Sequence, residues 1–164
     1  MVKQSDRAYA AGFFDGEGCV HIQMLKKRVG QRRSPSYQLT LVLDQVDPAP
    51  LMHIQSIFGG RVRCRMRKNG NRRAQFTLAF YGPQAARFLK QIRPFLIVKA
   101  AQADIALEFA RKKLKPGQVG RGGLSADTLA GYEAIKQELS RLKYIEFIPP
   151  QGVLMPIPRV QDNF

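Results

Sequence analysis

"AYAAGFFDGEGCV", residues 8–20, begins like the last turns of a helix and ends like the first residues of a strand. Its alanines favour a helix over residues 5–14, and Ser5 or Asp6 can cap the start of that helix. Two closely spaced glycines then interrupt the helical pattern, and an alternating apolar sequence follows. This stretch therefore predicts a helix that passes directly into a strand.

The same stretch contains two carboxylates, Asp15 and Glu17, in a chain whose formal net charge is +15. No acidic residue occurs from 18 to 43 or from 48 to 103. A positive charge patterned in this way indicates a polyanionic partner, either nucleic acid or an anionic membrane surface. A merely soluble basic protein is the alternative.

The 164 residues fit one domain, and the 45% of hydrophobic residues supply a core. The two cysteines, Cys19 and Cys64, form no CxxC pair, so neither a zinc site nor a disulfide framework is expected. The N-terminus lacks the apolar core of a signal peptide, and no apolar run reaches the length of a membrane span. We therefore expect a soluble intracellular protein with no membrane partner.

Four segments alternate between apolar and polar residues, as half-buried strands do. We expect these strands at residues 19–28, 37–45, 61–67 and 73–80, with an Asn69-Gly70-Asn71 turn between the last two. One face of each strand is apolar, and these faces carry Val20, Ile22 and Met24; Leu39, Leu41 and Leu43; Val62, Cys64 and Met66; and Phe76, Leu78 and Phe80.

Helices are expected in the rest of the chain. One follows Asp47 as N-cap and ends at Gly59, and another opens at Pro83. Two more are expected over 94–115 and after Ser125, before an apolar, proline-rich tail. The order αββαββα predicts an α+β fold, in which four antiparallel strands have one apolar face under helices.

The polar face of the predicted sheet suits DNA. The arginines of the third strand lie about 7 Å apart, which roughly matches the spacing of phosphates. Arginine and glutamine also make paired hydrogen bonds to guanine and adenine. Aromatic residues are scarce on this face, which disfavours the stacking mode of RNA recognition. A solvated arginine-rich face is the alternative. The residues that we assign to DNA binding are His21, Gln23, Leu25, Lys27, Gln38, Thr40, Val42, Arg61, Arg63, Arg65, Arg67, Arg73, Gln75 and Thr77.

The two carboxylates have two interpretations. In the structural one, Asp15 caps a turn and Glu17 pairs with an arginine. In the functional one, they belong to a hard-cation site at the phosphate backbone, because Mg²⁺ takes a few carboxylate or carbonyl oxygens together with water and phosphate oxygens. The C-terminal end of a helix disfavours negative charge, which makes their position there unusual.

Residues 9–18, "YAAGFFDGEG", resemble the signature of the LAGLIDADG homing endonucleases, and the telling positions are Gly12, Asp15, Gly16, Glu17 and Gly18. The αββαββα order is also that of the family, and the resemblance covers roughly the first 110 residues. It is greatest to the small single-motif members encoded in group I introns. The resemblance implies a LAGLIDADG-endonuclease fold with a saddle-shaped antiparallel sheet, a core over 5–115, and a helix and tail over 116–164.

The resemblance implies a site-specific endonuclease that cuts both strands of a long, pseudo-palindromic DNA target. Such an enzyme uses Mg²⁺ or Mn²⁺, binds DNA without cutting it in Ca²⁺, and needs no small-molecule cofactor. Glu17 and the carbonyl of Gly16 would hold the metal. "LTLVLDQVDP" and "IRPFLIVKAAQ" are similar to the family segments that supply a Gln and a Lys, here Gln45 and Lys99. Asp15 would hold the turn.

One departure from the family pattern concerns the residues after Gln45. Some relatives carry a basic residue there, whereas this chain reads Val-Asp-Pro-Ala-Pro over residues 46–50. Which basic residue completes the pocket is therefore open. The motif also occurs once, so two chains are needed to cut two strands, and the resemblance implies a homodimer with Ala8, Gly12 and Asp15 at the interface.

Two other functions fit the same resemblance. One is an RNA maturase that assists splicing of a group I intron, and the other is a catalytically inactive DNA-binding protein of this fold. The presence of Glu17 and Lys99 favours the nuclease. For the compartment we expect a chloroplast, a mitochondrion or the cytoplasm of the host that carries the intron.

Overall fold

The computed structural model describes residues 2–25, 35–66, 74–113, 119 and 123–143. Its elements confirm the predicted α+β order. In chain order they are α1 (Gln4–Glu17), β1 (Gly18–Leu25), β2 (Ser36–Gln45), α2 (Pro48–Phe58), β3 (Arg61–Met66), β4 (Ala74–Tyr81), α3 (Gly82–Ile92), the short 3₁₀ helix η1 (Arg93–Phe95), α4 (Ala100–Lys112) and α5 (Ala126–Lys143).

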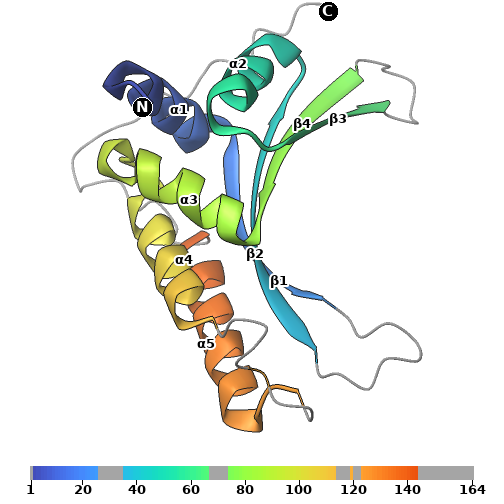
Figure 1. Ribbon diagram of the computed structural model, residues 1–164, viewed down its shortest axis with the longest axis vertical. Coiled ribbons are helices and arrows are strands. Elements are labelled where there is room, and N and C mark those ends of the chain that lie inside the picture. Colours follow the sequence, from blue (N-terminus) through green and yellow to red (C-terminus); the bar gives the residue numbers. More distant parts are fainter. Residues whose placement is uncertain (1, 26–34, 67–73, 114–118, 120–122, 144–164) are drawn as a thin grey trace, which may run out of the picture.

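The four strands form one antiparallel sheet in the order β1-β2-β4-β3. The helices gather on one side of this curved sheet and leave the opposite face uncovered (Figure 1). This arrangement follows from the alternation in the strands, because residues with period two point to opposite faces. We call the helix-covered face the inner face and the other the outer face.

The core fills the space between the inner face and the helices. Val20, Leu41 and Leu78 are fully buried, as predicted from the strand pattern. From the helix side, Phe88 of α3 stacks on Phe80 with ring centroids 4.2 Å apart. Each such aromatic side chain removes a large apolar area from water, so this cluster supplies much of the driving force for folding.

The junction of α1 and β1 is tight. The backbone N–H of Gly18 donates to the carbonyl of Phe14, so the helix continues through Glu17, three residues beyond its predicted C-terminal end. A Cβ atom at Gly18 would overlap the ring and the carbonyl oxygen of Phe14. Only glycine therefore allows the strand to start directly after the helix.

Two predicted caps are confirmed and one is wrong. Asp47 accepts a hydrogen bond from the Ala49 N–H at 2.9 Å, and the Ser125 hydroxyl accepts one from the Thr128 N–H at 3.2 Å. By contrast, Ser5 and Asp6 lie inside α1, whose N-cap position is Lys3 and carries no side-chain cap bond.

The predicted helix over 94–115 is also wrong at its start. The chain forms the 3₁₀ helix η1, then a non-helical segment, and α4 begins only at Ala100. The reason lies far away in the sequence, because the backbone N–H groups of residues 97–99 donate to the carboxylate of Asp15. A local apolar pattern does not reveal such a competing acceptor.

Two further outcomes concern the sheet. Met24 has the parity of the inner face but is 45% exposed, because β1 extends here beyond the buried core. Lys27, Arg67, Arg73, the Asn69-Gly70-Asn71 turn and the tail over 144–164 lie outside the described residues.

Candidate functional site

The carboxylate of Asp15 ties α1 to the segment before α4. One oxygen accepts the N–H groups of Ile97 and Val98 at 2.7 and 3.2 Å, and the other accepts the N–H of Lys99 at 2.9 Å. A carboxylate near the N-terminus of α4 is also favoured by the helix dipole. Both oxygens of Asp15 are therefore engaged within the chain, which leaves this side chain a structural role.

Lys99 lies against the end of α1. It is the N-cap residue of α4, and its side-chain amine donates a hydrogen bond to the carbonyl oxygen of Asp15. This contact places the cation two residues before Glu17, although the two positions are 82 residues apart in the sequence. The structure thus brings together two of the predicted catalytic positions.

Glu17 differs from Asp15 in its exposure and in its lack of partners among the described residues. It is the last residue of α1, and its side chain is exposed. In the described part of the chain, no hydrogen bond or ion pair engages its carboxylate. The sequence left open an ion pair between Glu17 and an arginine, and no such pair occurs within the described ranges. Its oxygens are free to accept a cation.

Gln45 is the last residue of β2. Gly18 pairs with Leu43, so Gln45 lies two residues beyond this pair, at the end of the sheet where α1 passes into β1. Its side-chain oxygen accepts the N–H of Val46 at 2.8 Å. This bond orients the amide and leaves its nitrogen as a donor for a phosphate oxygen or a water molecule.

The outer face carries the predicted arginines in register. Arg63 pairs with Thr77 across β3 and β4, and Arg65 pairs with Gln75. Both arginines are exposed and, like Arg61, make no ion pair with another described residue. Because residues opposite each other in a ladder point to the same face, these side chains form one basic, polar surface.

Some predicted DNA contacts are already engaged within the sheet. Thr77 donates a hydrogen bond to Asp44, and Thr40 is only 2% exposed and bonds to the Gln23 amide at 3.4 Å. Sequence reasoning gave Asp44 no role, although its parity in β2 places it on the outer face. His21, Gln38 and Val42 are half-buried on this face, and Leu25 is exposed.

A second group of polar side chains gathers at the start of β1. The Lys143 amine lies 3.6 Å from the Cys19 sulfur and 3.5 Å from Nδ1 of His21. The hydrogen bond from His21 is the main cause that lowers the pKa of the Cys19 thiol, with smaller contributions from the charges of His21 and Lys143, while burial opposes the shift. The sequence contained no signal for Lys143, because α5 meets β1 only in the folded chain.

The exposed face of α1 is lined by small residues. Ala8, Gly12 and Gly16 are exposed, and a Cβ atom at either glycine would meet nothing within 4 Å. Glycine inside a helix costs about 1 kcal/mol relative to alanine, and nothing in the described chain requires it at Gly12. Ile97 and Val98, whose backbone N–H groups donate to Asp15 of this helix, are 86% and 73% exposed.

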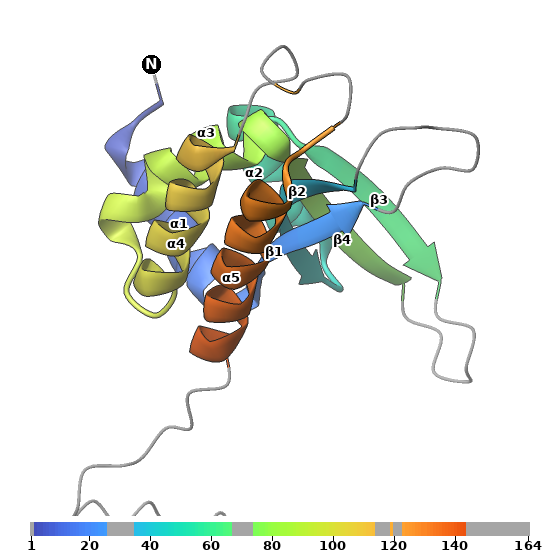
Figure 2. The same cartoon turned by 90° about the horizontal axis from the view of Figure 1, so that it is seen from below.

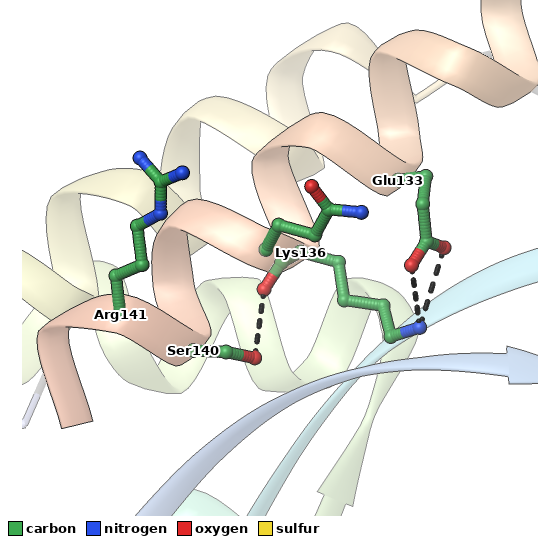
Figure 3. Close-up of a pocket in the computed structure, with 5 residues that line it drawn as sticks. Glu133, Lys136, Ser140 and Arg141 are labelled. Carbon is green, nitrogen blue, oxygen red and sulfur yellow. Dashed lines mark hydrogen bonds and ion pairs between the residues drawn. The ribbon is translucent and has the colours of Figure 1, made fainter. Parts of the chain in front are cut away.

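A shallow hollow on α5 is lined by Glu133, Lys136, Gln137, Ser140 and Arg141, and its lysine and glutamate pair with each other at 2.9 Å (Figure 3). No three His, Cys, Asp or Glu side chains of the described residues cluster as a metal site. Nor is any described helix both long and apolar enough to cross a membrane.

A comparison with family models identifies a LAGLIDADG endonuclease over residues 10–96, which is more than half of the chain. This range includes the α1–β1 junction and all four strands. It ends just before residues 97–99, whose N–H groups donate to Asp15. A comparison with curated proteins finds no match.

Solved structures share the fold. The homing endonuclease I-CvuI, crystallised with a DNA target in the presence of Mg, matches with a TM-score of 0.65 and 21% identity over 93% of this chain and 88% of that chain. The archaeal intron-encoded homing endonuclease I-Vdi141I, complexed with DNA, gives 0.64 and 18% over 91% and 87%. The homing endonuclease I-TnaI gives 0.58 and 20% over 84% and 92%.

Proposed function

Because this chain belongs to the LAGLIDADG endonuclease family, we propose that it is a homodimeric, divalent-metal-dependent enzyme that cuts both strands of a specific DNA target. The observation that carries the proposal is the contrast between two neighbouring carboxylates. Asp15 is fully engaged within the chain, whereas Glu17 is exposed and free at the edge of a basic sheet face. A free acid beside a polyanion-binding surface suits a cation that bridges protein and phosphate.

Glu17 and the carbonyl of Gly16 would hold the metal. The donor set fits a hard cation such as Mg²⁺ or Mn²⁺, because both groups are oxygen ligands and the remaining ligands can come from DNA and water. When bound, the metal activates water and stabilises charge on the phosphate. I-CvuI has been crystallised with DNA in the presence of Mg and of Ca, which supports this choice.

Lys99 and Gln45 would act directly on the reacting phosphate. The Lys99 amine is held at the end of α1 by the carbonyl of Asp15, so its charge lies near Glu17 without neutralising it. A fixed cation stabilises the negative charge that develops on a phosphate under attack. The free amide nitrogen of Gln45 can donate to a phosphate oxygen or orient the attacking water.

The outer face would bind the DNA. Arg61, Arg63 and Arg65 extend along β3 as exposed cations, and Gln75 and Gln23 lie on the same face. Phosphate contacts from the arginines would give salt-dependent affinity, and paired hydrogen bonds from arginine or glutamine to base edges would give sequence selectivity.

The homodimer would form through the small-residue face of α1. Two helices can approach closely only where small side chains leave room, and Gly12 lies there beside Ala8 with open space above it. Such a contact would bring the two Glu17 side chains near one another, and a divalent cation would offset their repulsion. A two-fold dimer then predicts a pseudo-palindromic target.

The experiment is a selection followed by a cleavage assay. The full chain is used to enrich bound duplexes from a randomised DNA library in Ca²⁺, and the selected duplexes are then incubated with protein in Mg²⁺. We expect two-fold-related sequences and double-strand breaks only in Mg²⁺. Binding without cleavage would favour an inactive DNA-binding protein, and failure to enrich any duplex would overturn the proposal.

A further inference from the structure

The last helix is attached firmly to the β1–β2 side of the sheet. Tyr37 on β2 donates a hydrogen bond to Glu133 at 2.8 Å. Tyr132 is buried between Tyr37 and Phe109, with ring centroids 5.7 and 5.4 Å away. Figure 2 shows α5 running alongside β1. Further along the helix, Leu139 is 2% exposed and belongs to the core cluster, so α5 is held in a defined place beside the sheet in both of its halves.

The C-terminal end of α5 reaches the outer face. Cys19 and His21, the two groups that Lys143 contacts, pair in register with Val42 and Thr40 and share their outward parity. The Lys143 amine thus lies on the face opposite to the core, although the other helices cover the inner face. Cys19 is two residues from Glu17, which is about 7 Å along an extended chain.

The charge of Lys143 has no counterion in the described structure. The other basic residues near the end of α5 are paired, with Lys136 bound to Glu133 and Arg141 to Glu138. Lys143 instead contacts a thiol and an imidazole and is half-buried. A lysine held in place without an acid beside a basic surface adds to the field that attracts a polyanion.

We propose that Lys143 contacts a DNA phosphate beside the start of β1, so that the C-terminal end of α5 forms one border of the DNA interface. This inference rests on the proposed function, because it assumes that DNA covers the outer face. The proposed contact joins the ammonium group of Lys143 to a phosphate, so it adds affinity without distinguishing one base sequence from another.

The first test compares substitutions at two basic positions in the same helical turn. Lys143→Met in the full chain should weaken binding of the selected duplex about fivefold to tenfold, and the slope of log K against log salt should become shallower by about one for each phosphate that is no longer neutralised. Lys143→Arg should retain most of the affinity. Arg141→Met removes the same charge from an ion-paired position and should change both quantities much less.

The second test uses the two cysteines as reporters on opposite faces. Cys19 lies on the outer face, whereas Cys64 has inner-face parity on the edge strand β3 and is exposed. Labelling with N-ethylmaleimide, read for each site by mass spectrometry, should slow at Cys19 when the duplex is bound and stay unchanged at Cys64.

The outcomes separate this inference from the proposed function. If the wild-type chain binds and cuts DNA but Lys143→Met and Arg141→Met behave alike, Lys143 acts only through net charge and the inference is wrong. Equal labelling of Cys19 with and without DNA would also overturn it. If no duplex is bound at all, the proposed function itself fails.

Discussion

Asp15 and Lys99 hold each other across 84 residues of sequence. The Asp15 carboxylate accepts the backbone N–H of Lys99 at 2.9 Å, and the Lys99 side chain returns a hydrogen bond to the Asp15 carbonyl. Asp15 therefore positions both the start of α4 and the side-chain amine of Lys99, which we propose takes part in the reaction. The two neighbouring carboxylates differ in this respect, because Asp15 is engaged within the chain, whereas we propose that Glu17 binds the metal.

Asp15→Asn should lower stability. The amide replaces one acceptor oxygen with a donor that faces the N–H groups of residues 97–99, and charge-assisted hydrogen bonds contribute about 1.5–3 kcal/mol each. We expect a loss of that order in the free energy of unfolding, measured in urea. Asp127→Asn changes an exposed aspartate in the first turn of α5 and should cost at most about 1 kcal/mol. Equal effects would contradict the role given to Asp15.

Gly12→Leu should separate the two chains. A side chain at this position meets no atom of the chain itself, so the fold should keep or slightly gain stability. On the proposed interface, however, it would block the approach of the second helix. Sedimentation at micromolar concentration should then show a monomer that no longer makes double-strand breaks. Gly131→Leu, on an equally open position of α5, is the matched control and should change neither.

Arg63→Ala should affect recognition. If the guanidinium reads a base, the substitution costs about 1–3 kcal/mol and relaxes selectivity at one position in each half-site. If it contacts only phosphate, binding weakens for all sequences and the salt slope decreases. Arg87→Ala, on the exposed side of α3, should leave both unchanged. An unaffected Arg63→Ala protein would mean that DNA binds another face.

The Cys19 thiol should ionise at lower pH than in the unfolded chain. A lowered pKa means that the thiolate persists to lower pH, so the rate of alkylation by iodoacetamide should rise at a lower pH than in urea. The folded state gains this stabilisation above the unfolded pKa and loses it as pH falls through the folded pKa. His21→Ala should raise the pH midpoint of the alkylation rate more than Lys143→Met does, because His21 is the larger cause of the lowered Cys19 pKa. Identical pH midpoints in folded and unfolded protein would contradict the lowered pKa of Cys19 in the folded state.

The faces of the strands were predictable because the alternation is strict. Leu39, Leu41 and Leu43 are buried, and Arg61, Arg63 and Arg65 are exposed, as the period of two requires. The N-cap Asp47 was predictable because the N–H group that it binds, at Ala49, is only two positions away in the sequence.

The start of α4 and the position of Lys143 were not predictable from local pattern. An apolar run after Pro94 favours a helix, yet the N–H groups of residues 97–99 find a stronger acceptor in Asp15. Lys143 reaches Cys19 because α5 packs against the sheet, through contacts that include the hydrogen bond from Tyr37 of β2 to Glu133. Both features depend on contacts between distant parts of the chain, which sequence periodicity does not contain.

The most direct test of the account is the cleavage rate of Glu17→Gln on the selected duplex in Mg²⁺, with binding followed by gel shift in Ca²⁺. The substitution keeps the size and polarity of the side chain and removes the charge that would hold the metal. We expect cleavage to fall by several orders of magnitude, because metal activation contributes several kcal/mol, about 1.4 kcal/mol for each tenfold. DNA binding should persist or tighten, while Glu138→Gln, a carboxylate on α5, should cut normally. A Glu17→Gln enzyme that breaks both strands at the wild-type rate would contradict the account.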